Sequence, residues 1–271
     1  MKLLRIIVLF FFFECKPLAI ICDLGGVFIE TNKKAASWYI GPTSYLYYLT
    51  TLSVPTGISL KKQLFAYLNT IEGHFEHHIT TYDSSGLPVP SIMAAWLAGA
   101  SSCNAIQELI NQQAKNNSFF SSHAQKLLIH KIANLIFDPA IFVQTRHISR
   151  SGTAFLQECK RDGHQLYILS NWDPESFALL ERVYPDFFAL FDGKIISGEV
   201  GLLKPDPTIY QHLLETFDLN PSDCLFIDDQ MSNIHAAESI GMRTVHYQKK
   251  NSFFGTRPNF ESIERVIQLL T

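Results

Sequence analysis

The sequence predicts an α/β protein whose core is a doubly wound parallel sheet of the Rossmann-like kind, interrupted by an inserted helical domain. Three observations support this prediction. Apolar runs of strand length alternate with helix-like patterns in the second half of the chain. A long stretch with only helix-like patterns separates the first apolar run from the second. The chain has 271 residues, 47% of them hydrophobic, which suffices for a large core with a second, smaller unit.

The first predicted strand covers residues 18–22, a continuous apolar run that ends in Asp23-Leu-Gly-Gly. An uninterrupted apolar run is typical of a parallel strand that is buried on both faces. Polar and glycine residues directly after such a strand indicate a turn at the edge of the sheet. This strand therefore places Asp23 at the carboxyl edge of the predicted sheet.

An apolar extension, residues 1–16, precedes this strand. Its positive charges, Lys2 and Arg5, are followed by eight apolar residues, 6–13, as at the start of a secretory signal. The run is shorter than the ~20 apolar residues of a membrane span, and Glu14 closes it. We expect an extension packed on a cytoplasmic protein, with export or membrane association through residues 6–13 as the alternative.

The middle of the chain is predicted to be a helical cap, residues 34–146, inserted into a core formed by residues 17–33 and 147–271. A strand–helix–strand crossover needs only ~30 residues, whereas 147 positions separate Asp23 from Ser170. Loops are predicted at residues 83–90 and 115–118, which are rich in Ser, Gly, Pro and Asn. The predicted helices of this stretch cover residues 59–69, 92–98, 105–114 and 124–136.

The second half of the chain alternates between the two periodicities. Predicted strands cover residues 165–169, 194–196, 224–227 and 244–246, and predicted helices cover residues 151–161, 175–183, 207–217, 233–240 and 260–270. This alternation predicts parallel strands joined by helices that cover both faces of the sheet.

Charge and cysteine content exclude several classes of function. The chain has 22 Lys and Arg against 25 Asp and Glu, a net charge of −3, so nucleic acid is not an expected partner. The five cysteines are scattered and include no CxxC pair, which argues against a disulfide framework or a structural zinc site. A reducing compartment, the cytoplasm, is expected.

Polar side chains follow three of the predicted strands. Asp23 follows the first, Ser170-Asn171 follow residues 165–169, and Asp228-Asp229 follow residues 224–227. In an open parallel sheet, ligands bind outside the carboxyl ends of the strands. Each of these residues could be a helix cap, and Lys204, in the intervening GLLKPDP segment, could be a solvated loop residue. Their joint occurrence at successive strand ends favours a functional site.

The ordered segments ICDLGGVF, YILSNWD, GLLKPDPTIY and FIDDQMSNIHAAESIGM resemble the motifs of the haloacid dehalogenase superfamily of phosphatases and related hydrolases. The resemblance covers residues 17–30 and 147–250, and the middle stretch matches only in its position, where the family inserts a helical cap of the C1 type. The resemblance implies Mg²⁺-dependent hydrolysis of a phosphate monoester, with a small phosphorylated metabolite as substrate.

The resemblance also assigns roles to the residues at the strand ends. Asp23 is expected to attack phosphorus and form an aspartyl-phosphate, which splits one difficult displacement into two. Ser170, Asn171 and Lys204 are expected to hold the phosphoryl oxygens. Asp228 is expected to orient Lys204 or a metal-bound water. The expected Mg²⁺ ligands are Asp23, Asp229 and the backbone carbonyl of Gly25.

Gly25 departs from the family pattern. The phosphatases usually carry a second aspartate there, which protonates the leaving oxygen, a contribution of roughly 100- to 10,000-fold. Slow turnover is therefore expected, and two alternatives remain open. One is a weak or inactive protein of this fold that serves as a binding or regulatory module. The other is a non-phosphatase hydrolase, although the dehalogenase branch usually has an aromatic residue at this position.

Some further residues have both a functional and a structural interpretation. His74 and His78 are one helical turn apart but lack a third ligand, which favours a solvated helix over a metal site. Aromatic residues of the middle stretch could line a substrate pocket or form the core of the cap: Trp38, Trp96, Tyr45, Tyr47 and Tyr48. The sequence makes no prediction of the oligomeric state.

Overall fold

A computed structural model describes residues 17–42, 44, 46, 57–71, 80–83, 85–115, 119–120, 122–252 and 255–270. The predicted extension at residues 1–16 lies outside the described residues. So do the His74–His78 pair and the tyrosines Tyr45, Tyr47 and Tyr48.

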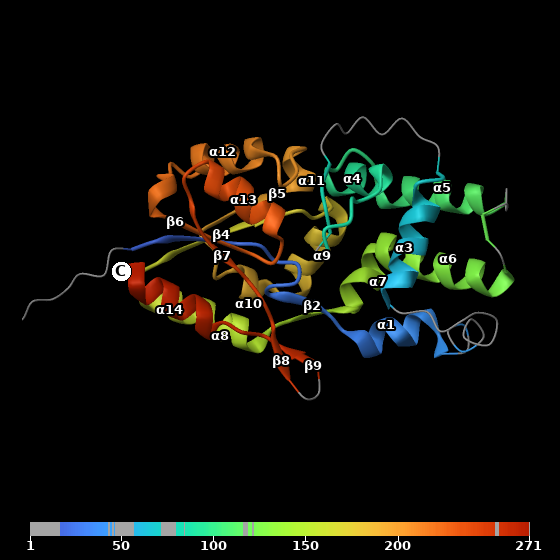
Figure 1. The fold of residues 1–271 in the computed structure, drawn as a ribbon, viewed down its shortest axis with the longest axis horizontal. Helices are drawn as coiled ribbons and strands as arrows, with labels where there is room; N and C mark the ends of the chain where they lie inside the picture. The colour runs from blue at the N-terminus through green and yellow to red at the C-terminus, as the bar shows by residue number, and fades with distance from the viewer. Residues whose placement is uncertain are drawn as a thin grey trace, which may run out of the picture.

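The centre of the molecule is a five-stranded parallel sheet with the strand order β5-β4-β1-β6-β7 (Figure 1). Its strands are β1 (Ala19–Cys22), β4 (Gln165–Ser170), β5 (Gly193–Ile196), β6 (Cys224–Asp228) and β7 (Arg243–His246). The first strand in the sequence is therefore the central strand, and the order reverses on either side of it. This topology confirms the predicted doubly wound α/β fold.

Successive side chains of the sheet point to opposite faces, and each face has its own apolar core. In β1, Ile20 and Cys22 belong to one hydrophobic cluster, whereas Ala19 and Ile21 belong to the other. Figure 1 shows α8 and α14 on one side of the sheet and α12 and α13 on the other. The bounds of the helices after β3 are α8 (Arg150–Arg161), α9 (Pro174–Val183), α10 (Pro185–Phe188), α11 (Ser197–Val200), α12 (Pro207–Thr216), α13 (Met231–Ser239) and α14 (Glu261–Leu270).

The chain segment between β2 and β3 is helical and has a third hydrophobic cluster of its own. Its helices are α1 (Lys33–Ile40), α3 (Gly57–Leu68), α4 (Ser91–Leu97), α5 (Cys103–Lys115), α6 (His123–Phe137) and α7 (Pro139–Gln144). Buried apolar residues of α3, α4, α5 and α6 form that cluster, among them Tyr67, Ile106 and Phe137. Figure 1 shows these helices gathered beside the carboxyl edge of the sheet rather than over one of its faces.

Two short antiparallel strands, β2 (Ile29–Thr31) and β3 (Arg146–Ile148), connect the sheet to these helices. Glu30 pairs with His147 in the ladder, and its carboxylate also lies 2.9 Å from the Lys249 ammonium. The chain thus leaves and re-enters the sheet region through one paired ribbon.

The helical segment also contacts the sheet region at α4 and α11. Gly99, which has a left-handed backbone (φ 71°), lies so close to Gly198 that a β-carbon at Gly99 would collide with the Gly198 carbonyl. The Ser197 hydroxyl donates a hydrogen bond to the Leu97 carbonyl at 2.6 Å. The Cys103 amide donates to Glu175 at 2.8 Å. The two glycines therefore permit a close approach of the backbones where α4 meets α11.

Most predicted elements are present, with bounds within two residues of the predicted ones. Several short elements were not predicted from the sequence: β2, β3, α1, α7, α10, α11 and the hairpin of β8 (Lys250–Ser252) and β9 (Gly255–Arg257). In the part of the chain that the structure describes, no helix combines the length and apolar character needed to cross a membrane.

Candidate active site

The sheet places three acidic or hydroxyl side chains together at its carboxyl edge. Asp23 directly follows β1, and its amide donates to the Ile227 carbonyl at 2.9 Å, which extends the ladder toward β6. Ser170 ends β4, the neighbour of β1 on the other side, and Asp228 ends β6. All three side chains are buried.

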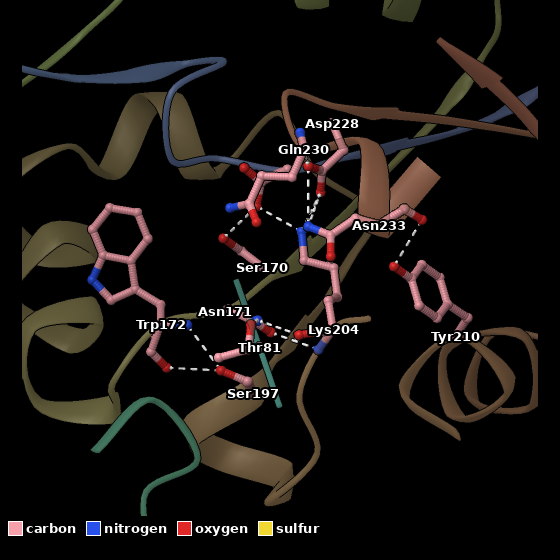
Figure 2. A network of polar contacts seen from close by, with 11 residues as sticks. Thr81, Ser170, Asn171, Trp172, Ser197, Lys204, Tyr210, Asp228, Gln230 and Asn233 are labelled. Atoms are coloured by element: carbon pink, nitrogen blue, oxygen red, sulfur yellow. Dashed lines mark hydrogen bonds and ion pairs between the residues drawn. The ribbon is translucent and has the colours of Figure 1, made fainter. Parts of the chain in front are cut away.

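Lys204 provides a buried positive charge between two of these carboxylates. Its ammonium lies 2.8 Å from Asp23 Oδ1 and 2.6 Å from Asp228 Oδ2, and only 1% of the residue is exposed. Burial alone would lower the pKa of Lys204, but the charges of Asp228 and Asp23 outweigh it and raise that pKa. Figure 2 shows the Lys204 side chain extending toward Asp228 beside Asn233. Lys204 therefore stays protonated and holds both carboxylates in place.

Asn171 fixes the backbone from which Lys204 extends. Its side-chain amide donates to the Lys204 carbonyl at 2.9 Å, and its side-chain oxygen accepts from the Lys204 amide at 2.9 Å. The same amide group donates to the Thr81 hydroxyl, which comes from the helical segment, at 3.3 Å. Ser170, next in sequence, donates its hydroxyl hydrogen bond to Asp23 Oδ1 at 2.9 Å.

Asp228 is surrounded by hydrogen-bond donors. The Asn233 amide nitrogen lies 3.1 and 3.0 Å from the two Asp228 oxygens, and the Gln230 backbone amide donates to Oδ1 at 2.8 Å. Tyr210 donates to the Asn233 carbonyl at 3.0 Å. Together with Lys204, these donors occupy the Asp228 carboxylate and hold it rigidly.

Asp229 has the opposite environment. Its Oδ1 is buried without a hydrogen-bond partner, and ligand atoms of Asp23, Asp228 and Asp229 lie within 4.8 Å of one another. Burial, followed by the charges of Asp23 and Asp228, raises the pKa of Asp229 to about 7. Burial also raises the pKa of Asp23 to about 6, although Lys204 acts in the opposite direction. Three carboxylates facing one ammonium leave a deficit of positive charge, and this donor set suits a hard divalent cation such as Mg²⁺.

Two glycines give the carboxylates room. Gly26 has a left-handed backbone (φ 83°), and a β-carbon there would collide with the Asp229 carboxylate. Gly25 is different, because a β-carbon there would meet nothing nearer than Trp172, at 3.7 Å. A β-carbon at Gly25 would therefore fit without a collision.

A cavity of about 340 Å³ opens beside this network. Its polar side includes Asp23, Gly25, Ser170, Asn171 and Lys204. The rest of its lining is largely apolar and comes from both the helical segment and the sheet region: Ile29, Met93, Trp96, Leu97, Phe142 and Trp172.

The structure brings together the polar site residues that the sequence predicted, but it adds others. Asn233, Thr81, Trp172 and Arg146 were not predicted. Of these four, only Asn233 could have been found from the sequence, because it lies in the predicted helix that follows Asp228 and Asp229. Of the aromatic candidates, Trp96 both belongs to the helical core and lines the cavity, whereas Trp38 is 81% exposed.

A parallel sheet with clustered carboxylates and a buried lysine at its carboxyl edge defines a hydrolase-like α/β protein. The sequence model of the haloacid dehalogenase-like hydrolase family matches residues 18–241 of this chain. The chain therefore belongs to that family.

Several curated relatives are phosphatases. The sesquiterpene phosphatase of Aspergillus oryzae is 33% identical over 94 residues, which is 35% of this chain and 47% of that protein. The D-ribitol-5-phosphate phosphatase of Bacteroides thetaiotaomicron is 31% identical over 98 residues, 34% of this chain and 46% of that protein. The chain thus matches less than half the length of either relative.

A solved structure has the same fold. This family enzyme from Bacteroides thetaiotaomicron, in complex with magnesium and inorganic phosphate, superposes with a TM-score of 0.55 at 16% sequence identity. The superposition covers 88% of this chain and 96% of that chain.

Proposed function

We propose that the protein is a Mg²⁺-dependent phosphatase that hydrolyses a small phosphorylated metabolite through an aspartyl-phosphate on Asp23. The observation that carries the proposal is the buried Lys204 between Asp23 and Asp228, beside the unpartnered oxygen of Asp229. The phosphatases among the relatives support it.

Asp23 has the environment of an oriented nucleophile. Ser170 and Lys204 both donate to its Oδ1, which fixes the carboxylate, while in the described part of the chain no hydrogen bond engages Oδ2. Attack by this carboxylate on phosphorus forms the acyl-phosphate and breaks the bond to the ester oxygen. Water then attacks the phosphorus, which releases inorganic phosphate and restores the carboxylate.

Lys204, Ser170 and Asn171 support this transfer from fixed positions. The ammonium of Lys204 offsets negative charge on Asp23 and on the transferring phosphoryl group, and Asp228 acts by positioning Lys204. Because these groups are already hydrogen-bonded, little reorganisation is required when the substrate binds.

Mg²⁺ would be held by the carboxylates of Asp23 and Asp229 and by the Gly25 carbonyl. When bound, it would offset the negative charge that accumulates between the phosphoryl group and the carboxylates. The buried, unpartnered Asp229 oxygen supports this assignment.

Residues 34–146 are proposed to act as the cap over the site. Their separate hydrophobic cluster, the β2–β3 ribbon and the contact of Thr81 with Asn171 support this role. The apolar cavity lining favours a substrate whose alcohol part is largely apolar.

A phosphate-release screen over phosphorylated metabolites, with Mg²⁺ and with chelator, tests the proposal. Activity should require Mg²⁺ and should disappear in Asp23→Asn, a nearly isosteric change. Full activity in chelator or in Asp23→Asn would refute the mechanism.

Gly25 favours a second candidate, a protein of this family that binds ligands with little turnover. Gly25→Asp distinguishes the two, because it adds the missing carboxyl group at a position where a β-carbon would meet nothing nearer than 3.7 Å. A rise of roughly 100-fold or more would show an active site that lacks only its acid. Undetectable phosphate release in both forms would favour the binding protein.

A further inference from the structure

Arg146, the first residue of β3, lines the cavity together with the catalytic groups. Its guanidinium carbon lies 3.8 Å from the centre of the Phe142 ring, and its Nη1 donates to the Thr31 hydroxyl at 2.5 Å. The Tyr184 hydroxyl donates to the Arg146 carbonyl at 3.1 Å and so fixes the backbone. The ring, the hydroxyl and the fixed backbone hold the guanidinium in one orientation before any ligand arrives.

This guanidinium has no acidic partner among the described residues. The acidic side chain of the β2–β3 ribbon, Glu30, instead contacts His147 and Lys249. A guanidinium offers five N–H donors, and the contact with Thr31 uses one of them. Burial lowers the pKa of Arg146 to about 10, which still leaves the group protonated at neutral pH.

The surroundings of Arg146 make a bound anion favourable. The polar groups at the strand ends occupy one part of the cavity, whereas Met93, Trp96 and Leu97 make much of the remainder apolar. Charge pairing is stronger in such apolar surroundings than in water. The planar fork of arginine also matches the geometry of a carboxylate or phosphate.

We propose that Arg146 forms a second anion subsite, which binds a carboxylate or phosphate carried by the alcohol part of the substrate. This inference rests on the proposed phosphatase function and narrows it. The substrate class is a phosphate ester with a compact, largely apolar body that carries a second anionic group. Asp23 attacks one end of this molecule, and Arg146 selects the other.

Matched esters test the subsite with the wild-type protein. The compounds are 4-carboxyphenyl phosphate, its neutral isostere 4-carbamoylphenyl phosphate, and 1,4-phenylene bisphosphate. A charge-assisted contact should raise kcat/KM for an anionic ester over the neutral one by about tenfold to a hundredfold. Preference for the carboxylate or for the bisphosphate identifies the anion that the subsite takes. Ratios near one for both anionic esters would overturn the proposal.

Variants assign the preference to Arg146. The ratio of kcat/KM for the anionic ester to that for the neutral ester should fall to near one in Arg146→Met. It should be partly retained in Arg146→Lys, which keeps the positive charge but loses the planar guanidinium. Arg150→Met is the matched control, because Arg150 is an exposed arginine of α8 outside the cavity lining. An anion preference that persists in Arg146→Met would place the subsite elsewhere and overturn the assignment. If Arg146→Met does not fold, Arg146→Lys and the wild-type ratios decide.

A binding measurement separates this inference from the proposed function. Trp96 and Trp172 line the cavity, so their fluorescence can report binding of phenylacetate and of its neutral isostere phenylacetamide. Phenylacetate should bind the wild-type protein at least tenfold more tightly than phenylacetamide, and this difference should vanish in Arg146→Met. If it does so while no ester is hydrolysed, the subsite stands and the phosphatase proposal fails. If esters are hydrolysed without anion preference, the phosphatase proposal stands and the subsite fails.

Discussion

Replacing Lys204 by methionine removes the only cation that contacts Asp23 and Asp228 in the described structure, while keeping a side chain of similar length. The wild-type ammonium lies 2.8 and 2.6 Å from the two carboxylates, and its side chain is 2% exposed. Removing one partner of a buried ion pair typically costs about 3–5 kcal/mol, because it leaves a buried charge uncompensated. We therefore expect Lys204→Met to lower the free energy of unfolding by about 3–5 kcal/mol.

The loss of stability in Lys204→Met should become smaller as the pH falls. Without Lys204 the pKa values of Asp23 and Asp229, already raised by burial to about 6 and about 7, should rise further. In the unfolded chain both groups titrate near 3.8, as a free aspartate does. Between these pKa values the native state binds more protons than the unfolded state, so the stability of Lys204→Met should rise as the pH falls from 8 toward 5.

Urea unfolding in chelator, at pH 8 and at pH 5, measures both effects. Lys194→Met is the matched control, because its ammonium contacts Glu181 at 2.5 Å but is 34% exposed. An ion pair with that exposure typically contributes about 0–1 kcal/mol. A loss in Lys204→Met no larger than in the control, or a loss that acid does not partly restore, would refute this prediction.

Three further predictions concern the metal site, His164 and Gly99. Mg²⁺ should stabilise the wild-type protein against heat, by about 2.7 kcal/mol at a hundredfold excess over its dissociation constant. Asp229→Asn should raise the Mg²⁺ concentration required for the same stabilisation. An unchanged melting temperature with Mg²⁺ would contradict the metal site. His164 is buried, its Nδ1 accepts from the Leu18 amide at 3.1 Å, and burial lowers its pKa. Because the unfolded histidine then binds protons first, the contribution of His164 to stability should fall as the pH drops below about 6.5. Asp23 and Asp229 act in the opposite direction in both proteins, so lowering the pH from 7.5 to 5.5 should change stability more favourably in His164→Asn than in the wild-type protein; an equal pH dependence would exclude His164 as a cause. Gly99→Ala should weaken the docking of α4 on α11, since the new β-carbon meets the Gly198 carbonyl, and should lower the free energy of chemical unfolding by about 1–3 kcal/mol. The control is Gly86→Ala, because Gly86 also has a positive φ but its β-carbon would meet nothing within 4 Å. Equal losses in the two variants would show that the contact is unimportant.

The elements that sequence analysis predicted are those whose stability is encoded locally. The strands β1, β4 and β6 are apolar throughout their buried length, so a short window of sequence identifies them. The missed strands β2 and β3 have three residues each, including the charged residues Glu30 and Arg146. Their strand structure depends on pairing with each other across more than a hundred positions. The helix α1, which has no buried residue, likewise gave no apolar pattern.

The same distinction applies to the site. Asp23, Ser170 and Asp228 could be predicted because the end of a parallel strand is also the edge where ligands bind. Thr81 and Arg146 could not, since nothing in their neighbouring sequence indicates that the chain returns to the cavity. Arg146 becomes visible as a candidate only when Phe142 and Thr31 are placed around it.

The position of Asp23 is coupled to the register of the whole sheet. Ala19 and Ile21 face the core under α12 and α13, and Ile20 and Cys22 face the opposite core. A shift of one residue in β1 would therefore exchange both faces. It would turn Asp23 toward the apolar cluster of Cys22 and Leu24 and separate it from Lys204. Burying that carboxylate without its cation would cost several kcal/mol, in addition to the loss of packing. The packing that selects the register of β1 thus also sets the position of the Asp23 carboxylate.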